Sequence, residues 1–568
     1  MSARRDRSAP TARVVSMTAV RPAAWTVVLV VAVLASCGCG PGDRAREPRP
    51  GGTLTMALRD SFATLDPADA WDPLATPFLH LLYDGLVAFD DSGTVRPACA
   101  GRWETSADGR TIRFHLRPGL RYASGTRIVA ADFKNGLERL FRTGSKRSVG
   151  APQFAAIEGA LRRGTRAGSE LGIETPDDRT LVLHLAWPDP FLLEKLAQPR
   201  YAIPVPSAAA GRLGDSYGAF PQTNGPYRVV RGGAGSFVFL RNPHYAAAKG
   251  SSLSGATDRT REHAVLRGLP DTIRVLTGVS SRRAMLGIES GRLDLVWPIP
   301  KEWRERLVRS PRLLTVRAAL DPPVTWYLAL NAELAPTARR DARRAVAFGV
   351  NRQVLFEELG PAVRPWRAID TQAAGTGGSP GYDPTQSRAF LSAARYDAGI
   401  RLPVTVPRGS ALSAALEALA PGLARGSIQV DDQALARGGW ERALVTRRGM
   451  VATIVPWQPP SRDGLDGLAS LLLNRGLGSG WAGNLAWYHP SAGLDTLLLR
   501  GLREHDPVAR QSVRDQLAAL LESDLPLVPL ARVQEEAVHV PEWTDVRFHP
   551  RYGLDLRALW RAGRGSSR

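Results

Sequence analysis

The stretch Arg102–Thr126, RWETSADGRTIRFHLRPGLRYASGT, decides the fold because its turn signal and its strand pattern agree. Ser106–Gly109 supplies the short polar side chains and the glycine that a tight hairpin turn requires. Thr111–Leu116 then alternates apolar with polar residues, as a half-buried strand does. Pro118-Gly119 ends that strand. The stretch therefore predicts a β-hairpin.

The length and charge of the chain set the limits for everything outside this hairpin. A chain of 568 residues is too long for one small core, so two or more domains or lobes are expected. Its formal net charge is +20, which is large enough to suggest a nucleic-acid or membrane partner. The positive residues are nearly all arginines and are scattered rather than gathered into runs, so we interpret them as a compositional bias and expect no nucleic-acid partner.

The first 50 residues have the pattern of a targeting segment. A basic region, Arg4–Arg21, precedes a short apolar run, Ala23–Ala35. A membrane-spanning helix needs roughly 20 apolar residues, so this run is too short, and we predict a signal peptide over residues 1–36. The following residues, 37–50, are rich in Gly, Pro and Arg and are predicted to form a flexible tether.

Several segments along the chain, together with the hairpin, resemble the family 5 solute-binding proteins, the extracytoplasmic receptors of peptide and nickel ABC importers. The resemblance covers about residues 51–350 and 451–560. The segments that carry it include Tyr83-Asp84-Gly85-Leu86, Ala130-Ala131-Asp132-Phe133, Asn224-Gly225-Pro226-Tyr227, Phe237–Tyr245, Val324–Asn331 and Asp524–Leu530.

A separate resemblance concerns the leader. Leu34-Ala35-Ser36-Cys37 is similar to a bacterial lipobox, in which the cysteine becomes lipidated. The alternatives are an ordinary signal peptide that is cleaved nearby, or a cysteine that stands there by chance. Cys39 is a weaker candidate for the lipid, because Ser36-Cys37-Gly38 before it lacks the aliphatic residue of the pattern. Lipidation of Cys37 implies a protein held by its lipid on the extracytoplasmic face of the cell membrane.

The resemblance also implies the fold: an α/β, two-lobed, periplasmic-binding-protein-like fold of type II (cluster C), with an extra subdomain inserted in the first lobe. We expect lobe I in residues 51–80, 201–273 and 489–568, the inserted subdomain in residues 81–200, and lobe II in residues 274–488. Near the C-terminus, Pro507–Leu521 predicts a helix with Arg510 and Arg514 on its outer side.

Two formal matches to catalytic or cofactor motifs lack the context that their chemistry requires. Gly478–Gly483 matches GxGxxG without a strand before it or a helix after it. Gly377–Gly381 matches the GxSxG elbow around Ser379, again without strand and helix. The nine histidines are scattered and there are only three cysteines, so we expect no metal site, no cofactor and no enzymatic activity.

The candidate binding residues follow from the resemblance and are mostly aromatic. Trp326, Tyr327, Trp457 and Tyr488 align with family segments at a lobe crossing or a cleft edge, and Ser61 begins a loop that lies at the cleft mouth in the family. Plain core packing is the alternative for the aromatic residues. Trp326 and Tyr327 are neighbours on one predicted strand, so only one of them can face the cleft.

At one position the chain departs from the peptide-binding branch. There the strand-end Trp is followed, three residues on, by an Asp that pairs with the α-amino group of the peptide, whereas this chain has Pro460 after Trp457. A buried ammonium needs a counter-charge. Either Asp463 takes this role, or the ligand lacks a free amino terminus. We favour the second hypothesis.

The expected function is therefore capture of a peptide or peptide-like ligand by a monomeric lipoprotein and its delivery to the permease of an ABC importer. A receptor that senses a peptide signal or serves cell-wall recycling is an alternative. A binder of nickel chelates and a secreted hydrolase built on Ser379 are further alternatives.

Overall fold

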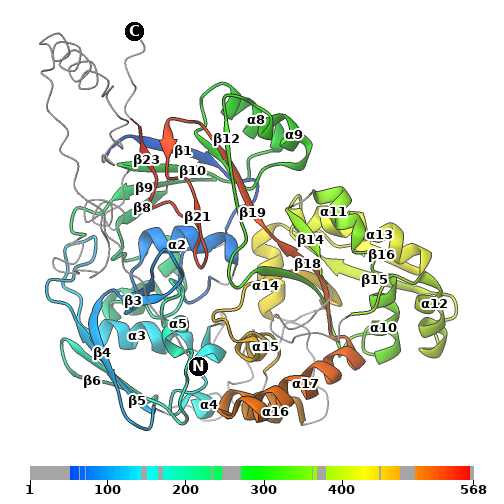
Figure 1. Ribbon diagram of the computed structural model, residues 1–568, viewed down its shortest axis with the longest axis horizontal. Helices are drawn as coiled ribbons and strands as arrows, with labels where there is room; N and C mark the ends of the chain where they lie inside the picture. Colours follow the sequence, from blue (N-terminus) through cyan, green and yellow to red (C-terminus); the bar gives the residue numbers. More distant parts are fainter. Residues whose placement is uncertain are drawn as a thin grey trace, which may run out of the picture. The chain divides into compact units, whose positions relative to one another are not determined.

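The computed structural model describes residues 51–62, 64–70, 72–141, 150–163, 170–231, 235–245, 270–360, 362–366, 379–446, 449–473 and 493–562 (Figure 1). The predicted signal peptide, Cys37, the Gly478–Gly483 loop and Tyr488 lie outside these residues. Within them, no helix combines the length and the apolar character needed to cross a membrane.

One mixed sheet of seven strands forms the part of the molecule that we call lobe I. Its central strand, β1 (Thr53–Ala57), pairs in parallel with β10 and β11, while the outer pairs are antiparallel. Its order is β12 (Leu314–Ala318), β19 (Glu535–His539), β11 (Leu295–Val296), β1, β10 (Thr272–Leu276), β9 (Ser236–Arg241) and β8 (Tyr227–Arg231).

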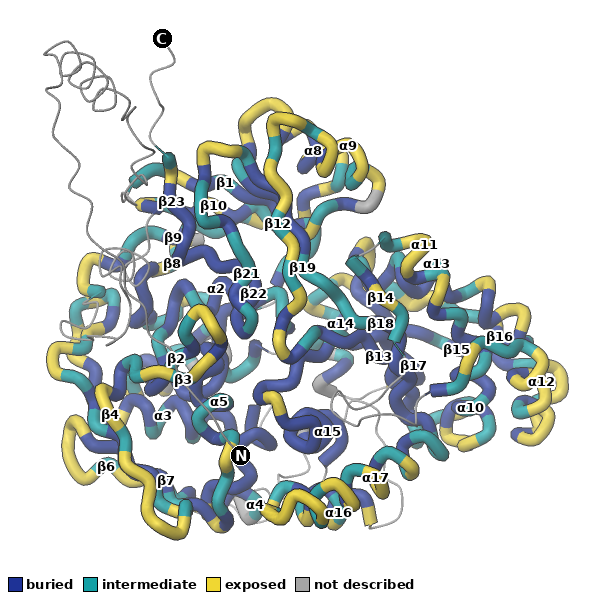
Figure 2. Tube along the Cα trace, in the orientation of Figure 1, coloured by how far each residue is buried: buried dark blue, intermediate teal, exposed yellow. Residues whose placement is uncertain are grey.

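A second mixed sheet, of six strands, forms the part that we call lobe II. Every residue of its strand β13, VTWYLAL, is buried, as expected for a continuous apolar strand that is covered on both faces (Figure 2). Its order is β14 (Val363–Pro365), β18 (Leu527–Val533), β13 (Val324–Leu330), β17 (Ala452–Trp457), β15 (Ile400–Thr405) and β16 (Ile428–Asp432).

The predicted hairpin is confirmed. It consists of β4 (Ala100–Thr105) and β5 (Thr111–Leu116), which pair Trp103 with Phe114. At the turn, Gly109 adopts a left-handed φ of 67° and donates its N–H to the Ser106 carbonyl at 2.9 Å. With β6 (Ile173–Asp177) and β7 (Thr180–His184) the hairpin forms a four-stranded antiparallel sheet, on which helix α3 (Ala130–Leu140) packs.

Two extended crossings join lobe I to lobe II, and they lie next to each other. Residues 319–323 connect β12 to β13, and Gln534 alone separates β18 from β19. Because β12 pairs with β19 and β13 pairs with β18, the four strands form two antiparallel pairs that follow one another across both sheets (Figure 1). The two crossings therefore lie next to each other along one line between the sheets.

These crossings lie elsewhere than the boundaries expected at residues 274 and 489. Residues 274–318 contribute most of β10 and all of β11 and β12 to the sheet of lobe I, and β18 belongs to the sheet of lobe II. The strands of both lobes are short and apolar, so alternation along the chain does not tell which sheet a strand joins. The structure puts the changes of lobe at residues 319–323 and at Gln534.

The region 360–450, which has little sequence signal, folds into the outer half of lobe II. It holds helix α12 (Pro384–Ala393), helix α13 (Ala411–Arg425) and helix α14 (Arg437–Thr446) beside β14, β15 and β16. Helix α13 contains Pro421 in its interior, and a proline there normally indicates the end of a helix. This local conflict explains part of the weak signal.

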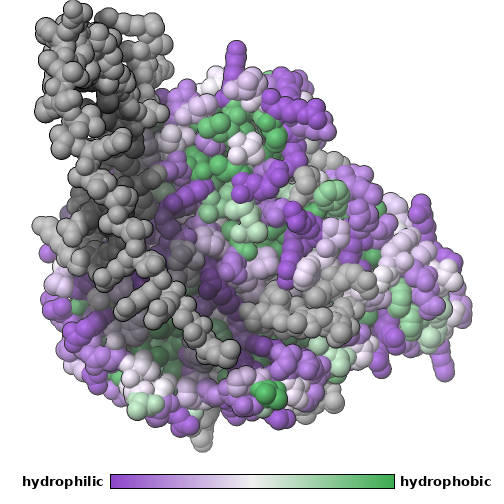
Figure 3. All heavy atoms as spheres, viewed as in Figure 1, coloured by the Kyte–Doolittle hydropathy of each residue, from purple (hydrophilic) through white to green (hydrophobic). Residues whose placement is uncertain are grey.

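Apolar side chains gather in separate cores. One cluster extends from the hairpin sheet into lobe II, and a second lies on the sheet of lobe I. Hydrophilic side chains cover much of the face in Figure 3, with apolar side chains in smaller areas between them. The apolar cores thus lie on the sheets and between the hairpin sheet and lobe II.

Helix α3 packs closely on the segment 203–205 of the same chain, and a substitution in the helix tests this packing. The Val205 N–H donates to the Asp132 carbonyl of α3 at 2.9 Å, and a methyl group on Gly136 would overlap the Ile203 carbonyl oxygen. We predict that Gly136→Ala lowers the free energy of unfolding by at least ~1–3 kcal/mol, the usual cost of overpacking. Thermal unfolding followed by circular dichroism measures this.

The matched control is Gly211→Ala in helix α6 (Ser207–Leu213), where a methyl group meets no atom within 4 Å. Its melting temperature should equal or exceed that of the wild type, because alanine favours a helix over glycine. Equal melting temperatures for the two variants would contradict the described packing of α3.

Candidate functional site

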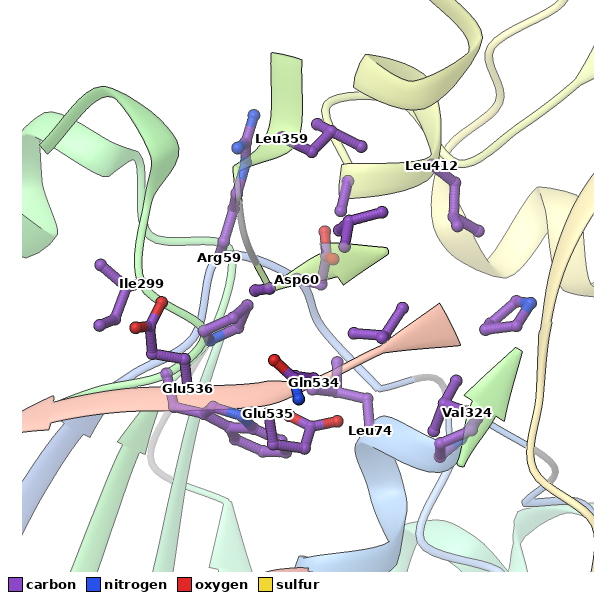
Figure 4. A pocket seen from close by; sticks show the side chains of 18 of the residues that line it. Arg59, Asp60, Leu74, Ile299, Val324, Leu359, Leu412, Gln534, Glu535 and Glu536 are labelled. Atoms are coloured by element: carbon purple, nitrogen blue, oxygen red, sulfur yellow. Dashed lines mark hydrogen bonds between the residues drawn. The ribbon is translucent and has the colours of Figure 1, made fainter. Parts of the chain in front are cut away.

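A cavity of about 200 Å³ lies between lobe I and lobe II beside the two crossings (Figure 4). Both lobes and the crossing at Gln534 contribute to its walls, which hold more apolar than charged side chains. From lobe I it is lined by residues that include Arg59, Asp60, Asp72, Leu74, Trp297, Ile299, Arg304, Glu535 and Glu536. From lobe II it is lined by residues that include Val324, Trp326, Val363, Leu412, Arg437 and Pro456.

The pleat of β13 decides which predicted aromatic residue reaches this cavity. Val324 and Trp326 share one face of the strand and both line the cavity, together with Pro456, the partner of Trp326 on β17. Tyr327 and Trp457 belong to the opposite face of the same sheet, where they are buried in the apolar core. The structure thus separates Trp326 from Tyr327 and Trp457.

Ser61 lies close to the cavity without lining it. It follows Arg59 and Asp60, which do line it, on the loop after β1. Its hydroxyl group donates to the Phe62 carbonyl at 3.3 Å. Among the predicted binding residues that the structure describes, Trp326 is the one that contributes to the cavity wall.

One arginine links the two lobes across the cavity. Arg437, on α14 of lobe II, forms an ion pair with Asp72 of lobe I and lies 3.9 Å from Asp60. In a second contact between the lobes the arginine belongs to lobe I: Arg59 Nε donates to the Gly409 carbonyl of lobe II at 3.1 Å. These contacts hold the lobes against each other at this side of the cavity.

Arg437 also pairs with Glu441, one turn further along α14, at 3.4 Å. Burial raises the pKa of Glu441 to about 7, in spite of the attraction of Arg437. Burial likewise raises the pKa of Asp60. The cluster around Arg437 therefore carries carboxyl groups that hold protons more tightly than exposed ones do.

The two glutamates at the start of β19 differ in their partners. Glu536 accepts from Arg304 at 2.6 Å and from Arg317 at 2.5 Å, so two guanidinium groups neutralise it. Glu535 accepts one hydrogen bond from Trp297 Nε1 at 2.7 Å. Burial raises the pKa of Glu535 and the indole bond opposes this rise.

Asp463, the proposed substitute for the missing family aspartate, is occupied by the protein itself. It caps helix α15 (Gly464–Leu472) and accepts from Arg510 at 2.6 Å and from Arg514 at 2.8 Å. The prediction that Arg510 and Arg514 lie on the outer side of α17 (Pro507–Asp524) is therefore wrong. Both reach inward, because the fully buried carboxylate of Asp463 requires compensating charge.

At position 460, where peptide binders carry their aspartate, the backbone carbonyl accepts hydrogen bonds from other residues of the protein. The Pro460 carbonyl accepts from Gln198 Nε2 at 3.1 Å and from the guanidinium of Arg551 at 3.0 Å. Arg551 is fully buried and pairs with Glu194 at 3.0 Å. Donors of the protein itself therefore occupy the carbonyl of Pro460.

Ser379 does not stand on a nucleophile elbow. It is buried and accepts a hydrogen bond from the guanidinium of Arg352, a group that cannot act as a base. The next helix, α12, starts only at Pro384, after its cap Asp383. The geometry that GxSxG chemistry requires, a strand, a sharp turn and a helix, is missing from residues 379–384.

The sequence did not reveal the charged residues of the cavity. Arg437 lies in the poorly readable region, and Glu535 directly follows the family-like strand near the C-terminus. One signal could have predicted the glutamates: three polar residues, Gln534-Glu535-Glu536, interrupt two apolar strands. Such an interruption at a lobe crossing places side chains near the cleft.

The family model for bacterial extracellular solute-binding proteins, family 5 Middle, matches residues 94–478. The chain belongs to this family. It is 30% identical over 303 residues to the probable deoxycholate-binding periplasmic protein YgiS of Escherichia coli (strain K12), over 52% of each protein. It is 26% identical over 354 residues to the glutathione-binding protein GsiB of Pectobacterium atrosepticum, over 61% of each. The chain thus spans about half to three fifths of the length of these relatives.

Solved structures confirm the predicted two-lobed α/β fold. OppA of Haemophilus influenzae in complex with the peptide RPPGFSPFR superimposes with a TM-score of 0.77 at 19% identity, covering 91% of this chain and 100% of that one. The murein tripeptide binding protein MppA of Escherichia coli gives 0.75 at 21% identity, covering 91% and 99%. At these identities the likeness concerns the fold.

The buried aspartate at the start of α15 allows a sharp mutational test. We predict that Asp463→Ala lowers the free energy of unfolding by ~3–5 kcal/mol, because it leaves two partly buried guanidinium groups without their counter-charge. Asp506→Ala is the control, since Asp506 caps α17 from an exposed position and its loss should cost ~1 kcal/mol. Urea denaturation compares them, and equal losses would contradict the described role of Asp463.

The raised pKa of Glu441 predicts how the free energy of unfolding changes with pH. Its pKa is raised from 4.5 to about 7 in the folded protein, so its contribution to stability is present below pH 4.5 and is lost as the pH rises through 7. Glu441→Gln should remove this loss, an amount on the order of 3 kcal/mol at about 1.4 kcal/mol per pKa unit.

The measurement is denaturant unfolding of wild type and variant between pH 5 and pH 8. The free energy of unfolding should fall more steeply with pH for the wild type than for Glu441→Gln. Glu417→Gln, exposed on α13, is the control and should follow the wild type. Parallel curves for all three proteins would contradict the account of Glu441.

Proposed function

We propose that this protein captures a peptide or peptide-like ligand between its two lobes outside the cytoplasmic membrane and delivers it to the permease of an ABC importer. The observation that carries the proposal is the cavity beside the two crossings, with walls from both lobes. Two lobes that are joined by neighbouring extended segments close by hinge motion around a ligand. Closure removes water from the ligand and strengthens its polar contacts.

The site suggests a small ligand with an apolar part. A cavity of about 200 Å³ lies below the ~300–1,000 Å³ that drug-sized ligands occupy. Trp326 offers a large and rigid apolar surface, and Leu74, Val324 and Leu412 extend it. Relatives of this chain are named for binding glutathione, oligopeptides and deoxycholate, so the family accepts ligands of different shape.

The roles of the other predicted residues follow from their places. We propose that Trp326 contacts the ligand, and that Tyr327 and Trp457 pack the opposite face of the sheet. Asp463 serves as a helix cap and ion-pair partner rather than as a receptor for a ligand amine. Ser61 remains a candidate at the cleft mouth, next to Asp60.

Membrane attachment is part of the proposal. A lipid on Cys37 and the tether of residues 37–50 would keep a monomeric receptor on the extracytoplasmic face, close to its permease. Tethering raises the effective concentration of the receptor at the permease without any new contact. A sensor of peptide signals or a receptor for cell-wall recycling would use the same capture step and differ only in its partner.

The test combines native mass spectrometry with one substitution. Protein purified without refolding should carry a small ligand, which is then identified and titrated into ligand-free protein by calorimetry. Trp326→Ala should weaken its binding roughly ten-fold or more, because the tryptophan forms a large apolar contact in the cavity.

Trp103→Ala is the control, since Trp103 lies on β4 of the hairpin sheet and packs on Phe114. Trp103→Ala should bind the ligand with the wild-type affinity, although it lowers the melting temperature about as much as Trp326→Ala does. Absence of any bound or titratable ligand would contradict capture between the lobes. Equal affinity of Trp326→Ala and wild type would contradict the location of the site.

A further inference from the structure

Glu535 is the acidic residue of the cavity wall for which the described side chains provide no ion-pair partner. It is partly buried and lies at the first position of β19, next to the crossing residue Gln534 (Figure 4). Its Oε2 accepts from Trp297 Nε1 at 2.7 Å. Within the described part of the chain, no lysine or arginine forms an ion pair with it.

The other charged groups of the cavity wall are engaged. Glu536 pairs with Arg304 and Arg317, and Asp72 pairs with Arg437, which also lies 3.9 Å from Asp60. Arg59 donates to the Gly409 carbonyl. The arginines that line the cavity are therefore committed to partners other than Glu535.

An ionised carboxylate in such surroundings is costly without a counter-charge. The wall around it is largely apolar, with Leu74, Ile299 and Val324 among its members. Burial accordingly raises the pKa of Glu535, which means that the empty site disfavours the charged form. A positive group that enters with a ligand would restore the balance.

We propose that Glu535 is the counter-charge for a cationic nitrogen of the ligand, an ammonium or a guanidinium group. This inference rests on the proposed function and names the chemistry of the ligand. Trp297 holds Oε2 of the carboxylate and so fixes its orientation. Oε1, for which the described residues provide no hydrogen bond, is the atom that receives the ligand.

The proposal changes the meaning of Pro460. The peptide binders meet a ligand amine with an acid at this position, whereas here the Pro460 carbonyl faces the guanidinium of Arg551. Glu535 places a negative charge at the lobe crossing instead. Proline at position 460 therefore does not exclude a cationic ligand, and the hypothesis that the ligand lacks a free amino terminus stays open until the source of the cation is tested.

Two sources of the cation are distinguished by three peptides. Trialanine carries a free amino terminus, N-acetyl-trialanine carries no cation, and N-acetyl-Ala-Lys-Ala carries its cation on a side chain. Calorimetry should show that the wild type binds at least one cationic peptide roughly ten-fold or more tightly than N-acetyl-trialanine. Preference for trialanine identifies the amino terminus, and preference for the lysine peptide identifies a side chain.

Substitutions then tie this preference to Glu535. Glu535→Gln keeps the hydrogen bond from Trp297 and should abolish the preference, while Glu535→Asp keeps the charge and should retain part of it. Glu302→Gln, exposed on the 3-10 turn Lys301–Trp303, is the matched control and should behave as the wild type. Melting temperatures confirm that each variant is folded.

Three results would overturn the proposal: equal binding of the three peptides by the wild type, binding of none of them, or a preference that survives in Glu535→Gln. Its failure is separable from failure of the proposed function. A neutral ligand found between the lobes by native mass spectrometry and titration would contradict the role of Glu535 and leave capture intact. A protein that carries and binds no ligand at all would contradict both.

Discussion

The paired crossing of β12–β13 and β18–β19 is the constraint on which the rest of the structure depends. Its two segments lie side by side, so the two sheets are joined along one line. A cavity between the lobes must therefore lie beside this line, and the residues at the crossing must reach it. The crossing residues that line the cavity are Gln534, Glu535 and Glu536. Arg437 of lobe II pairs with Asp72 of lobe I at its side. The crossing and the proposed binding site thus share the same few residues.

Arginine provides much of the charge balance inside this molecule. Arg510 and Arg514 compensate Asp463, and Arg304 and Arg317 compensate Glu536. Buried arginines also hold the backbone together: Arg343 donates to the Asp524 carbonyl and Arg352 to the Pro529 carbonyl. Part of the positive charge that looked like a compositional bias therefore has a structural use. Against this background Glu535 differs, because its only described polar partner is an indole.

The sequence predicts features that depend on neighbouring residues and fails where distant ones decide. The hairpin at Ser106–Gly109 follows from local turn chemistry, and the alternation of β13 correctly separates Trp326 from Tyr327. The changes of lobe at residues 319–323 and at Gln534 were expected instead at residues 274 and 489, because a short apolar strand fits either sheet. Arg514 looks like a surface residue until Asp463, 51 residues away, is placed beside it. That the described residues provide no ion-pair partner for Glu535 is evident only once Trp297 and the arginines of the cavity wall are placed.

In the proposed complex, both lobes hold one ligand beside the crossing, and a positive group of the ligand lies on Glu535. A crystal structure of the protein with the ligand that it carries through purification tests this most directly. We expect a ligand that contacts both Trp326 of lobe II and residues of lobe I, with a nitrogen at about 2.7–2.9 Å from Glu535, as in charge-assisted hydrogen bonds. A ligand that contacts one lobe only, or that lies against Trp457 on the opposite face of the sheet, would contradict it.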